Sequence, residues 1–201
     1  MQPTAPIDGP RAIPRIAPAP APLSADLARR MQRLLPAGMA IPQIFLTVAR
    51  NEGLFLHLVD TGLIGPTGLL DRKALPPALR ELVILRTCVA AGCEYEFNLH
   101  VQTISARMGL SADQIDAIRR PAPGMGLWDA RECAAMRLTD ALVARLEVTD
   151  AEFAAAREHF DEAMLIEITF LVGMYATVAM LAALARPRWD DYRVREDDAP
   201  G

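Results

Sequence analysis

An uncharged run near the end of the chain, residues 168–185, restricts the possible folds more than any other feature. Its eighteen residues read ITFLVGMYATVAMLAALA, which suits a helix that is buried on every side or that crosses a membrane. Glu167 directly precedes the run, and no aromatic belt flanks its N-terminal side. We therefore expect a helix that is buried by its own domain and by a partner subunit, and no membrane association.

The composition favours closely packed helices. Hydrophobic residues make up 52% of the 201 residues, whereas aromatic residues make up only 5%, so aliphatic side chains must fill the core. No segment of useful length alternates apolar and polar residues, which argues against strands. The sequence predicts an all-α fold with roughly seven or eight helices. The net charge is −4 and the basic residues are dispersed, which argues against nucleic-acid binding.

We expect three parts along the chain. Residues 1–23 form a Pro/Ala-rich arm, because its prolines exclude a regular helix. Residues 24–188 form one helical domain, and residues 189–201 form an acidic tail. Start and stop signals predict helices over the following segments of the domain: 25–35, 42–58, one opened by Pro76 and Pro77, 93–108, 111–118, 129–145, one capped by Thr149, and 162–184.

The cysteines indicate the compartment. There are three, Cys88, Cys93 and Cys133, and no secretory signal precedes them. An odd number of cysteines without such a signal is typical of a reducing environment. We therefore expect a cytoplasmic protein in which Cys88 and Cys133 are buried packing residues.

The stretch ELVILRTCVAAGCEYEFNLH, residues 81–100, places reactive side chains in an apolar helical setting. Cys93, Glu96 and His100 are spaced so that they share one face of a helix. Glu81 lies one helical segment earlier in the chain. Because packing alone favours aliphatic residues here, these four side chains are the candidate catalytic residues.

Each candidate has a chemical role that its position suggests. Cys93 lies near a helix N-terminus, where the peptide dipoles favour a thiolate of low pKa. Glu96 is four residues before His100 and could hold the imidazole in one tautomer. Glu81, if buried, would have a raised pKa and could act as a general acid.

Each candidate also has a purely structural interpretation. The thiol could be an inert core residue, and Glu96 with His100 could form an ordinary surface pair. Glu81 could pair with Arg80 or Arg86 on the helix surface. A metal site is not expected, because zinc sites need more ligands, or better spaced ones, than this stretch supplies.

Three segments carry a family resemblance: RELVILR (80–86), GCEYEFNLH (92–100) and MGLSADQIDAI (108–118). They resemble the carboxymuconolactone decarboxylase family, the wider group that includes alkylhydroperoxidase D, and the resemblance extends over roughly residues 40–186. It implies an alkylhydroperoxidase D-like helical bundle that assembles into homo-oligomers, as trimers or hexamers.

The motif differs from that of the redox members. In alkylhydroperoxidase D-like proteins a Glu precedes C-x-x-C-x-x-x-H, and Glu81, Cys93 and His100 match this pattern. Glu96 replaces the second cysteine, so the pattern here is C-x-x-E-x-x-x-H and an internal disulfide cannot form. The variant resembles the non-redox branch, whose members act on lactones or related small carboxylated metabolites.

The resemblance implies a lyase that needs no cofactor. Glu96 and His100 would be the acid/base pair for decarboxylation, or for a related lactone or enol-acid conversion, and Glu81 would handle a second proton. Tyr95, Arg86 and Arg107 are the expected substrate-binding residues, the two arginines by pairing with a carboxylate. Two alternatives remain open: a single-cysteine hydroperoxidase that uses Cys93, and a non-catalytic helical oligomer that binds a small ligand or a partner.

Overall fold

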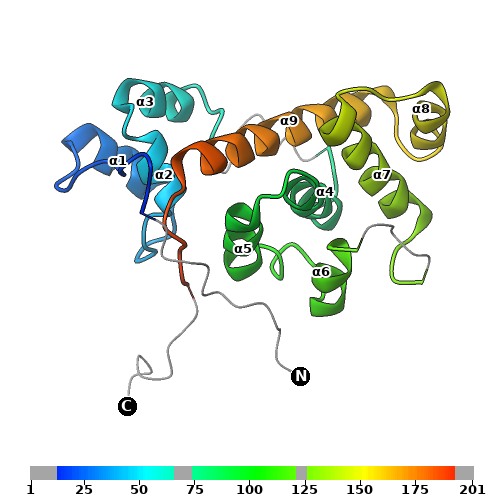
Figure 1. Ribbon diagram of the computed structural model, residues 1–201, viewed down its shortest axis with the longest axis horizontal. Helices are drawn as coiled ribbons and strands as arrows, with labels where there is room; N and C mark the ends of the chain where they lie inside the picture. The colour runs from blue at the N-terminus through cyan, green and yellow to red at the C-terminus, as the bar shows by residue number, and fades with distance from the viewer. Residues whose placement is uncertain (1–12, 66–73, 121–125, 193–201) are drawn as a thin grey trace, which may run out of the picture. The chain divides into compact units, whose positions relative to one another are not determined.

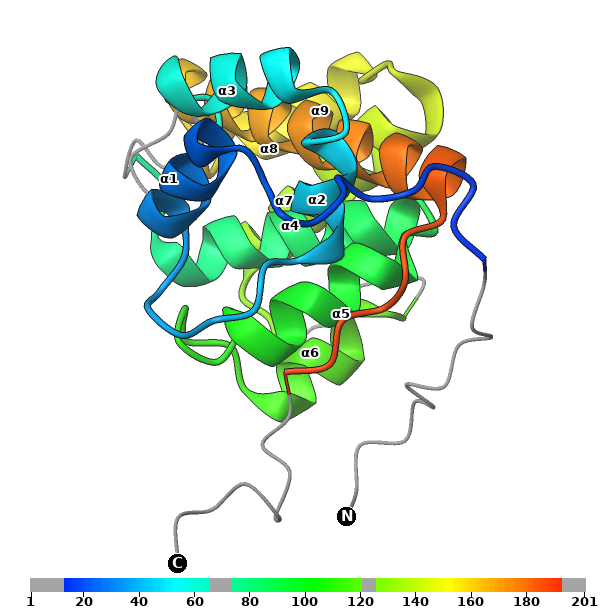
Figure 2. The same ribbon diagram turned by 90° about the vertical axis from the view of Figure 1, so that its left-hand side faces the viewer.

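The computed structural model describes residues 13–65, 74–120 and 126–192, and within these ranges every regular element is a helix (Figures 1 and 2). The predicted all-α class is therefore confirmed. The elements are α1 (Ala25–Leu34), α2 (Gln43–Val48), α3 (Glu52–Asp60), α4 (Pro77–Ala90), α5 (Glu94–Thr103), α6 (Ala112–Ile118), α7 (Ala130–Arg145), α8 (Asp150–Arg157) and α9 (Glu162–Ala185). Parts of the expected arm and tail, residues 1–12 and 193–201, lie outside the described residues.

Two of the expected helices end differently. The segment 42–58 forms two helices, because Asn51 interrupts it and caps α3 by accepting a hydrogen bond from the amide of Leu54 at 3.2 Å. The helix expected to reach residue 108 stops at Thr103, because Ile104 leaves the helical conformation (φ −128°). The additional break at Asn51 explains why the described residues hold nine helices, slightly more than expected.

The described residues divide into two compact units: 13–65 with 181–190, and 74–120 and 126–180 with 191–192. In the first unit α1 packs against α3 (Figure 2). Leu27 and Met31 from α1 meet Phe55 and Val59 from α3 in its apolar core. This unit contributes none of the candidate catalytic residues.

The second unit is organised around α4, which packs against α5, α6 and α7 (Figure 1). Pro77 starts the helix, where its missing N–H costs nothing. Every residue from Glu81 to Cys88 is buried, so α4 is covered on all sides and its polar side chains need partners inside the protein.

Arg86 finds such partners and joins three helices. Its guanidinium donates two hydrogen bonds of 2.6 Å to the carboxylate of Asp140 on α7. It also donates to the carbonyl oxygens of Ile118 and Arg120, each at 2.7 Å, at the end of α6. Because a helix end leaves its last carbonyls without partners, Arg86 satisfies groups that burial would otherwise leave unpaired.

Helix α9 carries the uncharged run. Among the described residues it is the one helix long and apolar enough to cross a membrane by length and composition, and 28% of its most apolar window is buried within the chain. The core helix of a soluble protein can pass the same test. The sequence predicts that the whole surface of this helix is buried, but a single chain buries only part of it.

Replacing Arg86 by alanine should lower the free energy of unfolding by about 2–3 kcal/mol, because Asp140 and two carbonyls lose their donor. The measurement is urea unfolding of the wild type and the variant. The matched control is Arg107→Ala, at an exposed arginine in the turn after α5 that donates to the carbonyl of Thr103, with an expected effect within about 0.5 kcal/mol. Equal effects of the two changes would contradict this role.

Candidate active site

The connection between α4 and α5 positions the site. Helix α4 ends in a Schellman motif: the amide of Gly92 donates to Val89 at 3.1 Å, and the amide of Cys93 donates to Cys88 at 2.8 Å. Gly92 has φ +66°, a left-handed conformation that glycine adopts without strain. The motif reverses the chain within two residues, so Cys93 becomes the N-cap of α5.

His100 lies between two carboxylates. Its Nδ1 is 3.0 and 3.2 Å from the two carboxylate oxygens of Glu81 on α4. Its Nε2 is 3.4 Å from Oε1 of Glu96, one turn earlier on α5. The Ser105 hydroxyl donates to Oε1 of Glu81 at 2.6 Å. All four residues are buried, which rules out the interpretation of Glu96 and His100 as a surface pair.

The two carboxylates stabilise the protonated imidazole. Burial alone lowers the pKa of His100, but the hydrogen bonds and charges of Glu81 and Glu96 outweigh it and raise the pKa from its ordinary 6.5 to about 9. His100 is therefore a cation at neutral pH, with both ring nitrogens protonated.

The prediction that the pKa of Glu81 is raised is wrong. Burial does raise it, but the hydrogen bond from His100, the charge of His100 and the hydrogen bond from Ser105 together lower it below its ordinary value. Glu81 is thus a carboxylate that orients His100, and it does not hold a proton for a general acid. It does not pair with Arg86, whose guanidinium binds Asp140.

Glu96 differs from Glu81 in the hydrogen bonds that its two carboxylate oxygens accept. Among the described residues, its Oε2 atom is buried without a hydrogen-bond partner, although the residue is only 6% exposed. A buried acceptor without a donor is costly, and such atoms are rare in folded proteins. Within the Glu81–His100–Glu96 cluster, this oxygen is the acceptor that lacks a donor among the described residues.

The low pKa expected for the Cys93 thiol is also wrong. Burial raises it, and the charges of Glu96 and Glu94 add to the effect, while hydrogen bonds from the amides of Glu96 and Tyr95 oppose it. Burial raises the pKa of Cys88 still further. The dipole of α5 therefore does not produce a reactive thiolate at Cys93.

Two neighbours of His100 were not expected from the sequence. The Tyr175 ring of α9 meets the imidazole edge to face, with ring centroids 5.2 Å apart. A tyrosine in an otherwise apolar run is a signal that could have found it, since a buried hydroxyl needs polar surroundings. The sequence gives no comparable indication that Ser105 belongs to the site, because a single serine after a helix is common.

The expected substrate-binding residues are not part of this hydrogen-bonded cluster. Arg86 is buried in the contacts that join α4, α6 and α7. Arg107 is exposed. Tyr95 is 7% exposed on α5, and its amide faces the Cys93 sulfur. No group of three or more metal-ligating side chains occurs in the described part of the chain.

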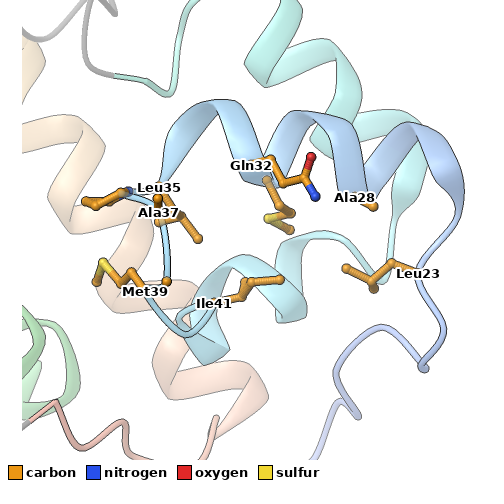
Figure 3. Close-up of a pocket in the computed structure, with 10 residues that line it drawn as sticks. Leu23, Ala28, Gln32, Leu35, Ala37, Met39 and Ile41 are labelled. Carbon is orange, nitrogen blue, oxygen red and sulfur yellow. The ribbon is translucent and has the colours of Figure 1, made fainter. Parts of the chain in front are cut away.

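A cavity of about 520 Å³ lies elsewhere, in the unit that contains α1 (Figure 3). Leu23, Met31 and Ile41 are among its apolar lining residues, and Gln32 is the only polar side chain among the residues that line it. Because none of these lining residues is titratable or nucleophilic, the cavity is not a candidate for acid–base chemistry.

Comparison with known proteins gives a family and two solved structures. Residues 66–141 match the model of the carboxymuconolactone decarboxylase family. A protein of unknown function from Agrobacterium tumefaciens, suggested to be the antioxidant defence protein AhpD, is 25% identical over 61% of this chain and 84% of its own, with a TM-score of 0.55. The debrominase Bmp8 in its apo form is 17% identical over 88% of this chain and 92% of its own, with a TM-score of 0.72. No curated protein matches the sequence significantly.

These likenesses confirm the alkylhydroperoxidase D-like fold. At 17% identity the debrominase supports the fold and not the reaction. The family match includes α4 and α5 with Glu81, Glu96 and His100.

Stability should fall as the pH rises from neutral toward 9. A group whose pKa is raised by folding stabilises the protein fully below its unfolded pKa, here 6.5, and loses that contribution as the pH passes about 9. The difference corresponds to about 3 kcal/mol. Urea unfolding at two pH values measures this loss of stability: pH 6.5, which equals the unfolded pKa, and pH 9.5, which lies about half a unit above the folded pKa.

The His100→Asn variant should lose most of this alkaline decline, whereas His57→Asn, at an exposed histidine, should keep it. On the acid side, the lowered pKa of Glu81 gives stability that is present above its ordinary value and lost as the pH falls through the lowered one. An unchanged alkaline decline in His100→Asn would show that His100 is not its source.

Proposed function

We propose that the chain is a cofactor-free enzyme of acid–base chemistry on a small metabolite, in keeping with the match of residues 66–141 to the carboxymuconolactone decarboxylase family. The observation that carries this proposal is the buried His100 cation between two carboxylates, one of which has a free oxygen. Pairs of carboxylates in different environments are typical of sites that divide acid and base roles.

The geometry favours a specific division of roles. Glu81, held by Ser105, orients His100 through Nδ1. Glu96 has the unoccupied oxygen Oε2 and is the proton acceptor, while the adjacent His100 cation stabilises negative charge on the substrate. This assignment reverses the roles expected from the sequence, in which Glu96 orients the imidazole and Glu81 exchanges the second proton.

The finer proposal is decarboxylation, or a related conversion of a lactone or enol acid. In an isomerisation, Glu96 takes a proton from the carbon beside the carbonyl, and an enolate forms next to His100. The proton then returns to another carbon. In a decarboxylation, the bond to the carboxyl carbon breaks, CO₂ leaves, and a proton from the Glu96–His100 pair neutralises the dienolate before solvent restores the pair.

A single-cysteine hydroperoxidase is the second candidate. It is favoured by the AhpD-like neighbour at 25% identity and by the backbone amides that face the Cys93 sulfur. In that reaction the Cys93 thiolate attacks a peroxide oxygen, an alcohol leaves, and an external thiol reduces the sulfenic acid. The raised pKa of Cys93 favours the acid–base function instead.

We also propose a homo-oligomer, a trimer or hexamer, that uses the outer face of α9. Ile166, Phe170, Gly173, Thr177 and Met180 are exposed and follow one another at alternating spacings of four and three residues, as along a coiled-coil seam. We call these five residues the α9 stripe. Ile166 and Phe170 also border an apolar groove of about 370 Å³ between α7, α8 and α9, which could accept a side chain of a second copy.

The free cysteines of the described residues support a reducing, cytoplasmic location. No partner other than a small substrate and further copies of this chain is proposed.

The test of function is a screen of lactones and enol acids for turnover. Where turnover is found, Glu96→Gln and His100→Asn should each lower kcat by at least about a hundredfold, as expected when an acid–base group is lost. Glu94→Gln, which changes a neighbouring exposed carboxylate paired with Arg119, should leave kcat within a factor of about three.

The same screen separates the alternatives. Cys93→Ser should keep acid–base turnover, because the thiol takes no part in it. Loss of a hydroperoxide-reducing activity in Cys93→Ser, without any turnover of lactones or enol acids by the wild type, would favour the peroxidase. A protein that turns over neither class of substrate would support the non-catalytic alternative.

Oligomerisation is tested separately by light scattering after size-exclusion chromatography. Phe170→Glu should shift the wild-type oligomer toward monomer, because it places a charge in the α9 stripe. Leu54→Glu, at an exposed leucine of α3, is the matched control and should keep the wild-type mass. A monomeric wild type would refute the assembly.

A further inference from the structure

We propose that Cys88 and Cys93 are a dithiol pair that reduces a hydroperoxide and forms an intramolecular disulfide. Cys93 reacts with the peroxide, and Cys88 is the resolving thiol. From the sequence, Cys88 is expected to be a packing residue, and Glu96 occupies the position of the second cysteine of the redox motif. The inference goes beyond the proposed acid–base function, because it requires neither Glu81 nor His100 as a proton carrier.

The first argument is the distance between the two cysteines. They are the paired ends of the Schellman motif, in which the amide of Cys93 donates to the carbonyl oxygen of Cys88 at 2.8 Å. With standard bond lengths, this hydrogen bond holds the two Cα atoms at most about 6.7 Å apart. Disulfides join Cα atoms that are about 4.4–6.8 Å apart. Side chains at these two positions of the motif frequently contact each other, so a disulfide can span them.

The second argument is that the thiol of Cys88 lies beside the first turn of α5. Burial raises the pKa of this thiol, and among the charged groups Glu96 and Cys93 add most to the effect. Because the interaction between charges decays with distance, the thiol lies near these two residues. Cys93 is the N-cap of α5 and Glu96 belongs to its first turn. Cys88 therefore borders the candidate site and the Cys93 thiol.

The third argument assigns the two roles. Cys93 is 7% exposed and Cys88 only 1%, so a small peroxide reaches Cys93 first. The amides of Glu96 and Tyr95 face the Cys93 sulfur, where they stabilise the negative charge of an attacking thiolate. Burial raises the pKa of both thiols, that of Cys88 more strongly. We therefore expect a slower reaction than that of a cysteine with a low pKa.

The reaction takes place in two balanced steps. The Cys93 sulfur attacks one peroxide oxygen, the O–O bond breaks, and the alcohol leaves with the thiol proton. The Cys88 sulfur then attacks the sulfenic acid: an S–S bond forms, the S–O bond breaks, and hydroxide leaves with the Cys88 proton as water. The two thiols lose two electrons, which the peroxide accepts. An external dithiol reduces the disulfide and restores both thiols.

The experiment treats the reduced full-length protein with hydrogen peroxide, the smallest hydroperoxide, at a pH of about 8.5, where an ordinary thiol is half ionised. The remaining thiols are alkylated, and the protein is digested with trypsin. No lysine or arginine lies between Thr87 and Arg107, so Cys88 and Cys93 fall in one peptide and Cys133 in another. Mass spectrometry detects the disulfide as a peptide that is not alkylated and is lighter by two hydrogen atoms.

The wild type should lose two of its three thiols for each peroxide consumed, and dithiothreitol should restore them. Cys88→Ser should form no disulfide, and dimedone should trap the sulfenic acid of its Cys93. Cys93→Ser should consume no peroxide. Cys133→Ser, at a buried cysteine of α7, is the matched control and should form the same disulfide as the wild type.

The inference is overturned if the wild type does not react, or if it consumes peroxide without forming the disulfide. Sulfinic acid at Cys93 beside an alkylated Cys88 would be the second of these results, and it would indicate a single-cysteine reaction. Both results are read on the wild type, so they stand even if a variant does not fold. Neither bears on the acid–base function, because a protein that converts an enol acid and forms no disulfide loses only the redox activity.

Discussion

The buried contact between Glu81 and His100 is the interaction on which the site depends. It joins α4, which is covered on all sides, to α5, which the Schellman motif at Gly92 turns back toward it. Neither group could be buried in charged form alone, because the desolvation cost of an unpaired ion is several kcal/mol. Each makes the other's charge tolerable, which is why folding lowers the pKa of Glu81 and raises that of His100. Ser105 completes the pair by donating to the same carboxylate.

This pair makes the two glutamates chemically different although their side chains are identical. Glu81 receives hydrogen bonds from His100 and Ser105, which satisfy its carboxylate and fix its orientation. Glu96 shares the same imidazole through one oxygen and has its other oxygen buried and unpaired. A carboxylate with all its hydrogen bonds stabilises the fold, whereas one with a buried, unpaired oxygen carries a desolvation cost that is not offset. This asymmetry is the physical basis for proposing Glu96 as the proton acceptor.

Much of this could be predicted from the sequence, because local spacing determines it. The helical class, the turn at Gly92 and the one-turn spacing of Glu96 and His100 depend on residues close together in the chain. The charge states could not be predicted, because they depend on tertiary partners. A helix N-terminus favours a thiolate at Cys93, but burial outweighs it. Burial favours a protonated Glu81, but a histidine nineteen residues later outweighs it.

Helix α9 links the site to the proposed assembly. Tyr175 contacts the ring of His100, while Gly173 and Thr177, on either side of it in sequence, belong to the exposed stripe. Residues two apart on a helix point in widely different directions, so one element can contact the imidazole of His100 and, in the proposed assembly, a second copy of the chain at once. A helix whose outer face is left in water gains little from its apolar residues, whereas the same face packed against a partner is fixed in place. Assembly would therefore hold Tyr175 against His100, and this gives the uncharged run a role in the site as well as in packing.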